Sequence, residues 1–227
     1  MIIQKYDIIE VLRELTNSYQ ITIVVDSHID NLDGTFTIET KNTYHFNKGM
    51  MFTVLGVDYT VTDFVQNESL TYKKSLNSSP SLESDFVINS PIKYLVGTPR
   101  LTNQELTLLQ YNLKRFPFLW VIENYRLDYS KNGSSLFACE GDFTITLFND
   151  ANREEWLNLD HRINVLNPLK GLLDDWMNYV SKDKRVYNFE DWSIRPLIDY
   201  GISESQVLPD QITGLELTIN IKLYKTC

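Results

Sequence analysis

The sequence contains few of the residues that hold small folds together or bind metals. There are two cysteines in 227 residues, Cys139 and Cys227, and three histidines, His28, His45 and His161. Two isolated cysteines form no disulfide framework and no paired Cys-x-x-Cys ligand set, and no His-Glu-x-x-His pattern is present. We therefore expect no metal, no cofactor and no structural disulfide, in a protein made in a reducing cytoplasm.

Positive charge is also in short supply. The chain carries 21 Lys and Arg against 30 Asp and Glu, which gives a formal net charge of -9 and a pI of about 4.8. Binding along a nucleic-acid backbone depends on a surplus of cations that displace counterions from the phosphates. The charge balance therefore predicts no sequence-specific nucleic-acid partner.

Long apolar runs are missing as well. Residues 1–7 lack the basic segment and apolar stretch of a signal peptide. The longest apolar cluster, at 116–122, is interrupted by Pro117 and is far shorter than the ~20 residues of a membrane-spanning helix. We expect no membrane partner. The 43% of hydrophobic residues and 12% of aromatic residues instead predict a folded chain with a substantial core.

No catalytic motif is present in the sequence. It has no Gly-x-Gly-x-x-Gly, no phosphate-binding Gly-x-x-x-x-Gly-Lys and no Gly-x-Ser-x-Gly. Neighbouring acids such as Asp174 and Asp175 point about 100° apart on a helix, so they do not form a proton-sharing pair. Glu39-Thr40-Lys41 resembles half of a nuclease motif but lacks the preceding Pro-Asp pair. We interpret Cys139 as a buried apolar residue and the histidines as surface or capping residues, and expect no enzyme.

The first 98 residues contain one helical pattern followed by short strand patterns. Ile8, Ile9, Leu12 and Leu15 have helical spacing and predict a helix over 1–19. The predicted strands lie at 21–25, 35–40, 51–55, 59–62, 69–72, 86–88 and 92–96. Short, evenly spaced strands are typical of a small closed barrel, because closure removes exposed sheet edges. The polar segment 75–81 predicts a mobile loop.

The remaining residues show longer elements. Thr102 and Glu105 form a capping box that begins a helix ending before Pro117. Asn132-Gly133 predicts a hairpin between strands at 118–129 and 135–148. A helix is expected at 161–181, in which Pro168 either introduces a kink or begins a new helix capped by Asn167.

Two further strand patterns complete the chain. Arg195-Pro196 places the segment 186–200 at a sheet edge. Strict alternation of apolar and polar residues over 215–223 predicts a strand with one face in the core. The predicted fold class is α+β, with an antiparallel sheet, a long hairpin, two helices on one face and an additional β-rich module. The predicted domains are a helix at 1–19, a barrel-like module at 20–98 and an α+β domain at 99–227.

The layout of residues 100–227 resembles the tail-terminator and neck (head-tail completion) proteins of tailed bacteriophages. The segments that carry the resemblance are 118–122, 142–150, the helix at 162–180 and the strand at 212–223. The resemblance implies a structural virion protein of the phage neck or tail, assembled in the bacterial host cytoplasm. It also implies a homo-oligomeric ring, six-fold or twelve-fold, that surrounds the DNA channel and meets portal, connector or tail-tube proteins.

Within such a ring we expect Glu123, Asp128, Glu140 and Asp142 to face the lumen. An acidic wall would repel DNA and so let it pass without being held. The β-rich residues 20–98 would form an addition on the outside of the ring.

Aromatic residues suggest a second set of contacts. Trp156 and Trp192 lie near the ends of predicted elements and are candidate interface residues, whereas Trp120 and Trp176 fall on core patterns. The alternative function is a carbohydrate- or receptor-binding module in the β-rich region, tested through Tyr59 or Tyr72. A small hydrolase or nuclease with an atypical site is a third hypothesis.

Overall fold

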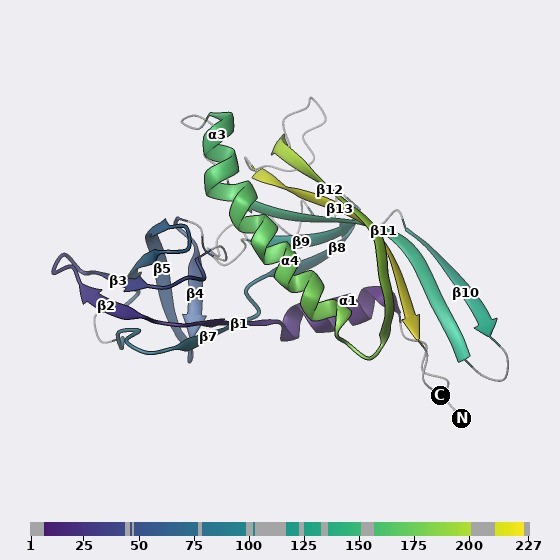
Figure 1. Cartoon of the computed structure of the whole chain (residues 1–227), viewed down its shortest axis with the longest axis horizontal. Helices are drawn as coiled ribbons and strands as arrows, with labels where there is room; N and C mark the ends of the chain where they lie inside the picture. The colour runs from purple at the N-terminus through teal and green to yellow at the C-terminus, as the bar shows by residue number, and fades with distance from the viewer. Residues whose placement is uncertain are drawn as a thin grey trace.

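The chain folds into two β-rich lobes joined by a two-stranded ribbon, with the N-terminal helix packed on the larger lobe (Figure 1). The computed structural model describes residues 7–43, 46, 48–76, 79–98, 102, 117–122, 125–132, 136–150, 157–200 and 212–224. Within them the mixed α+β class is confirmed, with mostly antiparallel strand pairs in sheets of two, five and six strands.

Helix α1 (Ile8–Ser18) confirms the predicted N-terminal helix over its described part. The Asp7 carboxylate accepts a hydrogen bond of 3.0 Å from the Ile9 amide, so Asp7 is the N-cap that the sequence pattern did not single out. The apolar stripe of α1, which includes Val11 and Leu12, is buried. The helix therefore begins at a side-chain cap and is held in place by one apolar face.

The smaller lobe is a five-stranded antiparallel sheet in the order β2-β3-β6-β5-β4. Its strands are β2 (Ser27–Asp30), β3 (Thr35–Glu39), β4 (Met51–Val54), β5 (Val57–Val65) and β6 (Ser69–Lys74). Strand β2 is not among the predicted strands, because Ser-His-Ile-Asp has little β propensity. In the pairings of the described residues β2 and β4 are opposite edges, so the expected closed barrel is not confirmed.

A two-stranded ribbon connects this lobe to the rest of the protein. It consists of β1 (Gln20–Ile23) and β7 (Phe86–Asn89), which pair antiparallel from Gln20 opposite Asn89 to Ile23 opposite Phe86. Both strands match predicted segments, but they pair with each other rather than with β2–β6. Figure 1 shows the ribbon running from α1 into the smaller lobe.

The larger sheet has the strand order β12-β13-β11-β9-β8, and β10 also pairs with β11. Its strands are β8 (Lys93–Gly97), β9 (Phe118–Ile122), β10 (Arg126–Asn132), β11 (Leu136–Asp150), β12 (Val186–Tyr200) and β13 (Ile212–Tyr224). β8 pairs parallel with β9, so the expectation of a wholly antiparallel sheet is wrong at this edge. A parallel pair requires a long connection, and the residues between Gly97 and Phe118 provide that length.

The predicted hairpin is present, but its first strand is divided. Both β9 and β10 pair antiparallel with β11. The step from Val121 to Arg126 covers five residues, whereas their partners Ile145 and Asp142 are three residues apart on β11. The extra residues interrupt the ladder between the two strands, which a pattern of alternation alone does not reveal.

The predicted helix at 161–181 is also confirmed, and Pro168 lies within it. It consists of α3 (Asn158–His161), the π-helical turn η2 (Arg162–Leu166) and α4 (Asn167–Ser181). Pro168 lies in the first turn of α4, as the second alternative predicted, but Asn167 is not the cap of that helix, because it has helical φ and ψ angles and belongs to α4. The Asn167 amide donates to the carbonyl of Arg162, and this wider turn accommodates a proline that lacks an N–H.

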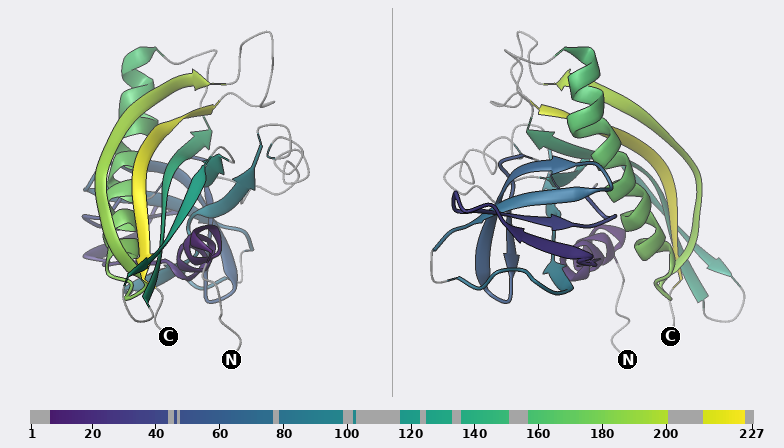
Figure 2. Two further views of the ribbon diagram at one scale, coloured as in Figure 1. Left: turned by 90° about the vertical axis from the view of Figure 1, so that its right-hand side faces the viewer. Right: turned by 60° about the vertical axis from the view of Figure 1, so that its left-hand side comes forward.

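Helices α1 and α4 lie on the same face of the larger sheet and pack against it and each other (Figure 2). At their contact the indole Nε1 of Trp176 donates to Thr16 Oγ1 over 3.0 Å, and the same hydroxyl donates to the Leu12 carbonyl over 2.7 Å. The helix predicted at 102–116 lies outside the described residues except for Thr102. The Thr102 amide donates to the Thr98 carbonyl over 3.0 Å, which places Thr102 inside a helical turn rather than at its cap.

Candidate functional site

The face of the larger sheet opposite α1 and α4 is the surface on which the predicted acidic residues meet. Inward residues of β11 and β13, such as Ile145 and Leu217, belong to the core shared with the helices, so their neighbours in sequence point to the other face. The polar ladder is our name for the polar side chains on this second face. Its members are Arg126, Asp128, Glu140, Asp142, Thr144, Arg195, Glu216, Thr218, Asn220 and Lys222.

The register of the sheet places two predicted lumen residues directly opposite each other. Asp128 on β10 pairs with Glu140 on β11, and like charges in this position repel. Each carboxylate has its own cation: Arg126 lies 3.1 Å from Asp128, and Lys222 Nζ lies 2.7 Å from Glu140 Oε2. The two ion pairs offset the repulsion and reduce the negative charge of this surface.

The third predicted acid has a neutral partner. The Asn220 amide donates to Asp142 Oδ1 over 2.9 Å, and Asp142 is exposed. At the next part of the ladder Arg195 makes two contacts with the Glu216 carboxylate, at 2.5 and 2.9 Å. The named members of the polar ladder thus include four carboxylates and three cations, which gives these described side chains a formal charge of -1.

An apolar patch continues this face beyond the polar ladder. It is a separate core cluster formed by Leu95, Phe118, Trp120, Phe148 and Ile212, with Leu197 packed against it. The Trp120 indole donates to the Gly97 carbonyl over 3.0 Å, which fixes β9 against β8. Gly214 lies beside this cluster, where an added Cβ would come within 2.4 Å of the Phe148 ring. The face is therefore polar at one end and well packed at the other.

The structure brings together only some of the predicted site residues. Asp128, Glu140 and Asp142 share the polar ladder, whereas Glu123 and Trp156 lie outside the described residues. Trp192 is 50% exposed on β12, next to Asp191, whose φ of 53° marks a bulge where β12 gains one residue on β13. The prediction that 186–200 forms an edge strand is confirmed, because β12 is the last strand of its sheet.

The burial of His161 differs from the prediction. His161 is buried, and its Nδ1 lies 2.8 Å from Thr213 Oγ1, so it is not a surface residue. His28 is half-buried in β2, where it stacks on Phe36. Cys139 is buried as predicted.

The two tyrosines of the carbohydrate-binding alternative are also interior. Tyr59 and Tyr72 are buried and make an edge-to-face contact with ring centroids 5.6 Å apart. Burial raises the pKa of Tyr72 to about 12, and its hydroxyl accepts from the Leu82 amide. These rings stabilise the smaller lobe and do not provide an exposed sugar platform.

The cations of the polar ladder were not singled out in the sequence. Arg126, Arg195 and Lys222 occupy the same alternating positions as the acids, so the polar phase of each strand is the signal that could have found them. Across the described ranges, no group of three or more His, Cys, Asp or Glu is arranged to hold a metal ion. In that same part of the chain no helix has the length and apolar character needed to cross a membrane.

The sequence was also compared with known proteins. No protein-family model matches it, and a comparison with curated proteins yields no match.

Proposed function

We propose that this chain is a structural, non-enzymatic virion protein that assembles into a homo-oligomeric ring at the neck or tail of a tailed phage. In this proposal the polar ladder faces the channel through which DNA passes. The observation that carries the proposal is the larger sheet, whose one face is covered by α1 and α4 while the other displays the paired charges of the polar ladder.

The sheet edges support assembly by heterologous contacts. A ring requires each subunit to offer two different surfaces that meet by rotation. Among the described strands β12 pairs only with β13, and β10 pairs only with β11, so one side of each strand is open for a neighbour. The β12 and β10 edges differ, since β12 contains bulges and Pro196 whereas β10 does not. β8, at the other end of the strand order, is a third strand with one partner among the described strands. Such edges are suited to join unlike partners and disfavour uncontrolled pairing.

The charges of the polar ladder support passage of DNA without binding. Its paired charges leave few cations able to displace counterions from phosphates, so it offers little affinity for DNA. The repulsion is weaker than that of the bare acidic wall expected from the sequence, because Arg126 and Lys222 neutralise two of the acids. The proposed channel surface is therefore close to neutral and hydrophilic.

The test is the assembly state of the purified chain and of phage particles. Light scattering after size-exclusion chromatography is expected to give a multiple of the 26.5 kDa subunit, and electron microscopy is expected to show closed rings of six or twelve copies. Mass spectrometry of virions of the phage that encodes the chain should detect it at ring stoichiometry. A chain that stays monomeric at high concentration and is missing from particles would refute the proposal.

A further inference from the structure

The β2–β3 turn of the smaller lobe holds a leucine out into solvent. Leu32 is 91% exposed, and its φ of 62° lies in the left-handed region that leucine disfavours. The Leu32 amide donates to Asp30 Oδ1 over 2.9 Å, and the Thr35 amide donates to Asp33 Oδ1 over 2.9 Å. The Asn31 side chain adds a bond of 2.9 Å to Thr35 Oγ1. The turn is therefore braced in a strained shape that presents an apolar side chain.

Such a turn has the properties of a preformed binding element. A side chain that is already fixed loses little conformational freedom when it enters a partner, so more of its burial contributes to affinity. Within its own chain the exposed Leu32 side chain gains almost nothing from burial. Binding of Leu32 to another molecule would offset the cost of this strained backbone.

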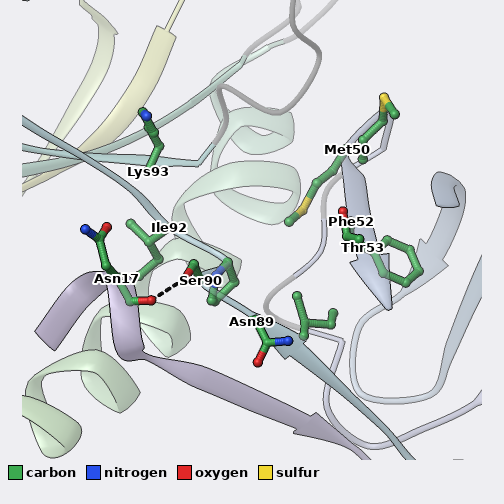
Figure 3. Close-up of a pocket in the computed structure, with 11 residues that line it drawn as sticks. Asn17, Met50, Phe52, Thr53, Asn89, Ser90, Ile92 and Lys93 are labelled. Atoms are coloured by element: carbon green, nitrogen blue, oxygen red, sulfur yellow. Dashed lines mark hydrogen bonds between the residues drawn. The ribbon is translucent and has the colours of Figure 1, made fainter. Parts of the chain in front are cut away.

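A pocket with apolar and polar walls lies at the opposite edge of the same lobe, where β4 meets the connecting ribbon and the end of α1. The pocket has a volume of about 270 Å³ and lies between β4, β7 and the connection from β7 to β8 (Figure 3). Its apolar lining comes from Met50, Met51, Phe52, Ile88, Pro91 and Ile92, and its polar lining from Asn17, Thr53, Asn89, Ser90 and Lys93. Small-molecule sites are generally larger, at about 300–1,000 Å³. An apolar cavity of about 150 Å³ already accepts a benzene ring, so this pocket has room for one leucine side chain.

The charges around the turn and the pocket are complementary. Asp30 and Asp33 flank Leu32, and the hydrogen bonds from Thr35 hold the pKa of Asp33 below its usual value, which keeps it anionic. Lys93 is exposed beside the pocket and forms no ion pair with any other described residue. An incoming leucine flanked by carboxylates would therefore bring them near an available ammonium group.

One molecule does not fill its own pocket with this leucine. The β2–β3 turn belongs to one edge of the five-stranded sheet, and β4, which lines the pocket, is the other edge. Figure 1 shows the turn projecting from the far end of the lobe, while β4 lies toward α1. The β2–β3 turn and the pocket are different surfaces of the same chain. A contact between them would therefore be heterologous and would continue from copy to copy.

We propose that Leu32 of one copy inserts into the pocket formed by Met50, Phe52, Ile88 and Ile92 of a second copy, with Asp30 and Asp33 facing Lys93. This contact would join neighbouring subunits of the proposed ring. Whether the contacts close into a ring rests on the proposed function. It assigns the smaller lobe a role as the link between neighbouring subunits.

The first test compares two matched substitutions. Leu55 is 97% exposed and also left-handed, with a φ of 49°, but it lies in the β4–β5 turn. Asparagine tolerates this conformation, so Leu32→Asn and Leu55→Asn should both fold. From the usual value of burying a leucine, Leu32→Asn is expected to weaken self-association roughly 10- to 100-fold in analytical ultracentrifugation, whereas Leu55→Asn leaves it unchanged. Equal association of both variants and the wild type would overturn the contact.

The second test places one cysteine on each side of the contact in a Cys227→Ser background. Leu32→Cys chains are mixed with Met51→Cys chains, Met51 being another residue of the pocket wall. Mild oxidation is expected to give a reducible dimer of the two chains, while Leu55→Cys mixed with Met51→Cys gives none. No cross-link in the first mixture would also overturn the contact.

The outcomes separate this contact from the proposed function. Rings that persist in Leu32→Asn would refute the contact and leave the ring proposal standing. A specific Leu32→Cys to Met51→Cys cross-link in open chains, with no closed rings, would support the contact and refute the ring.

Discussion

Thr16 is the residue through which α1 and α4 share a buried hydrogen bond. Its hydroxyl accepts from the Trp176 indole at 3.0 Å and donates to the Leu12 carbonyl. Thr16→Val keeps the shape but removes the acceptor, so we expect the free energy of unfolding to fall by about 1–2 kcal/mol. Urea unfolding followed by tryptophan fluorescence measures this change.

The control for that substitution is a polar contact at the surface. Ser18→Ala removes the 3.0 Å contact between the Ser18 and Tyr179 hydroxyls, which is exposed. Water replaces such a partner, so the change should stay within about 0.5 kcal/mol. Equal effects of Thr16→Val and Ser18→Ala would show that the buried bond contributes nothing specific.

At the scale of residues the sequence predicts which apolar side chains are buried better than it predicts polar roles. Trp120 and Trp176 are in the core as expected, because strand and helix periodicity places them on apolar faces. His161 was expected at the surface but is buried against Thr213, a residue 52 positions later. A histidine can be buried when a hydroxyl far away in the sequence forms a hydrogen bond with it. The residues near His161 in the sequence do not reveal that partner.

One arginine in the turn between α4 and β12 connects this turn to α1 through ion pairs. Arg185 Nε lies 2.8 Å from Asp183 Oδ1, and Arg185 Nη1 lies 2.6 Å from Glu14 on α1. Arg185→Gln should lower the free energy of unfolding by about 1 kcal/mol at pH 7, while Arg13→Gln, in an exposed pair with Glu10, should have almost no effect.

The pH dependence of this loss follows from Asp183. Hydrogen bonding from Arg185 lowers the pKa of Asp183 below 3.8, so its contribution is present above that pH and is lost as pH falls through the lowered pKa. The difference between wild type and Arg185→Gln, measured by urea unfolding, should therefore shrink from pH 5 to pH 2. A constant difference over that range would contradict the assignment.

Element boundaries show where local patterns were sufficient and where they were not. Alternation in 215–223 predicts β13 and its buried face, because a strand repeats every two residues wherever it pairs. The break between β9 and β10 and the parallel partner β8 depend on register with β11 and on chain crossing, which are properties of pairs of strands. Pro168 lies in the first turn of α4 as one alternative predicted, but Asn167 is no cap, because a π-helical turn continues the helix across that position.

For the whole molecule, the proposed channel makes a prediction about charge. Asp128→Lys with Asp142→Lys turns the polar ladder strongly cationic, so assembled rings should bind duplex DNA at least about tenfold more tightly at 50 mM salt and lose the gain near 200 mM. Fluorescence anisotropy measures the affinity. In phage particles the same variant should slow DNA ejection without preventing assembly.

The matched control changes the net charge by the same amount as the ladder variant, but on other surfaces. Asp26→Lys with Asp174→Lys alters the smaller lobe and the outer side of α4, both exposed positions. This variant should bind DNA more weakly than the ladder variant and leave ejection unchanged. Equal DNA binding by both variants would argue that the polar ladder does not line the channel.

The sequence by itself determined the α+β class, the helix α1 and the strand β13 near the two ends of the described chain, and the buried faces of α1, α4 and β13. These features follow from hydrophobic periodicity, which acts within a few residues. Only the tertiary structure decided that β8 joins the larger sheet and that two of the predicted acids carry cationic partners. It also set Leu32 and the pocket beside β4 on opposite edges of one lobe. Those arrangements depend on strand register and order, which are set by contacts between residues far apart in the chain.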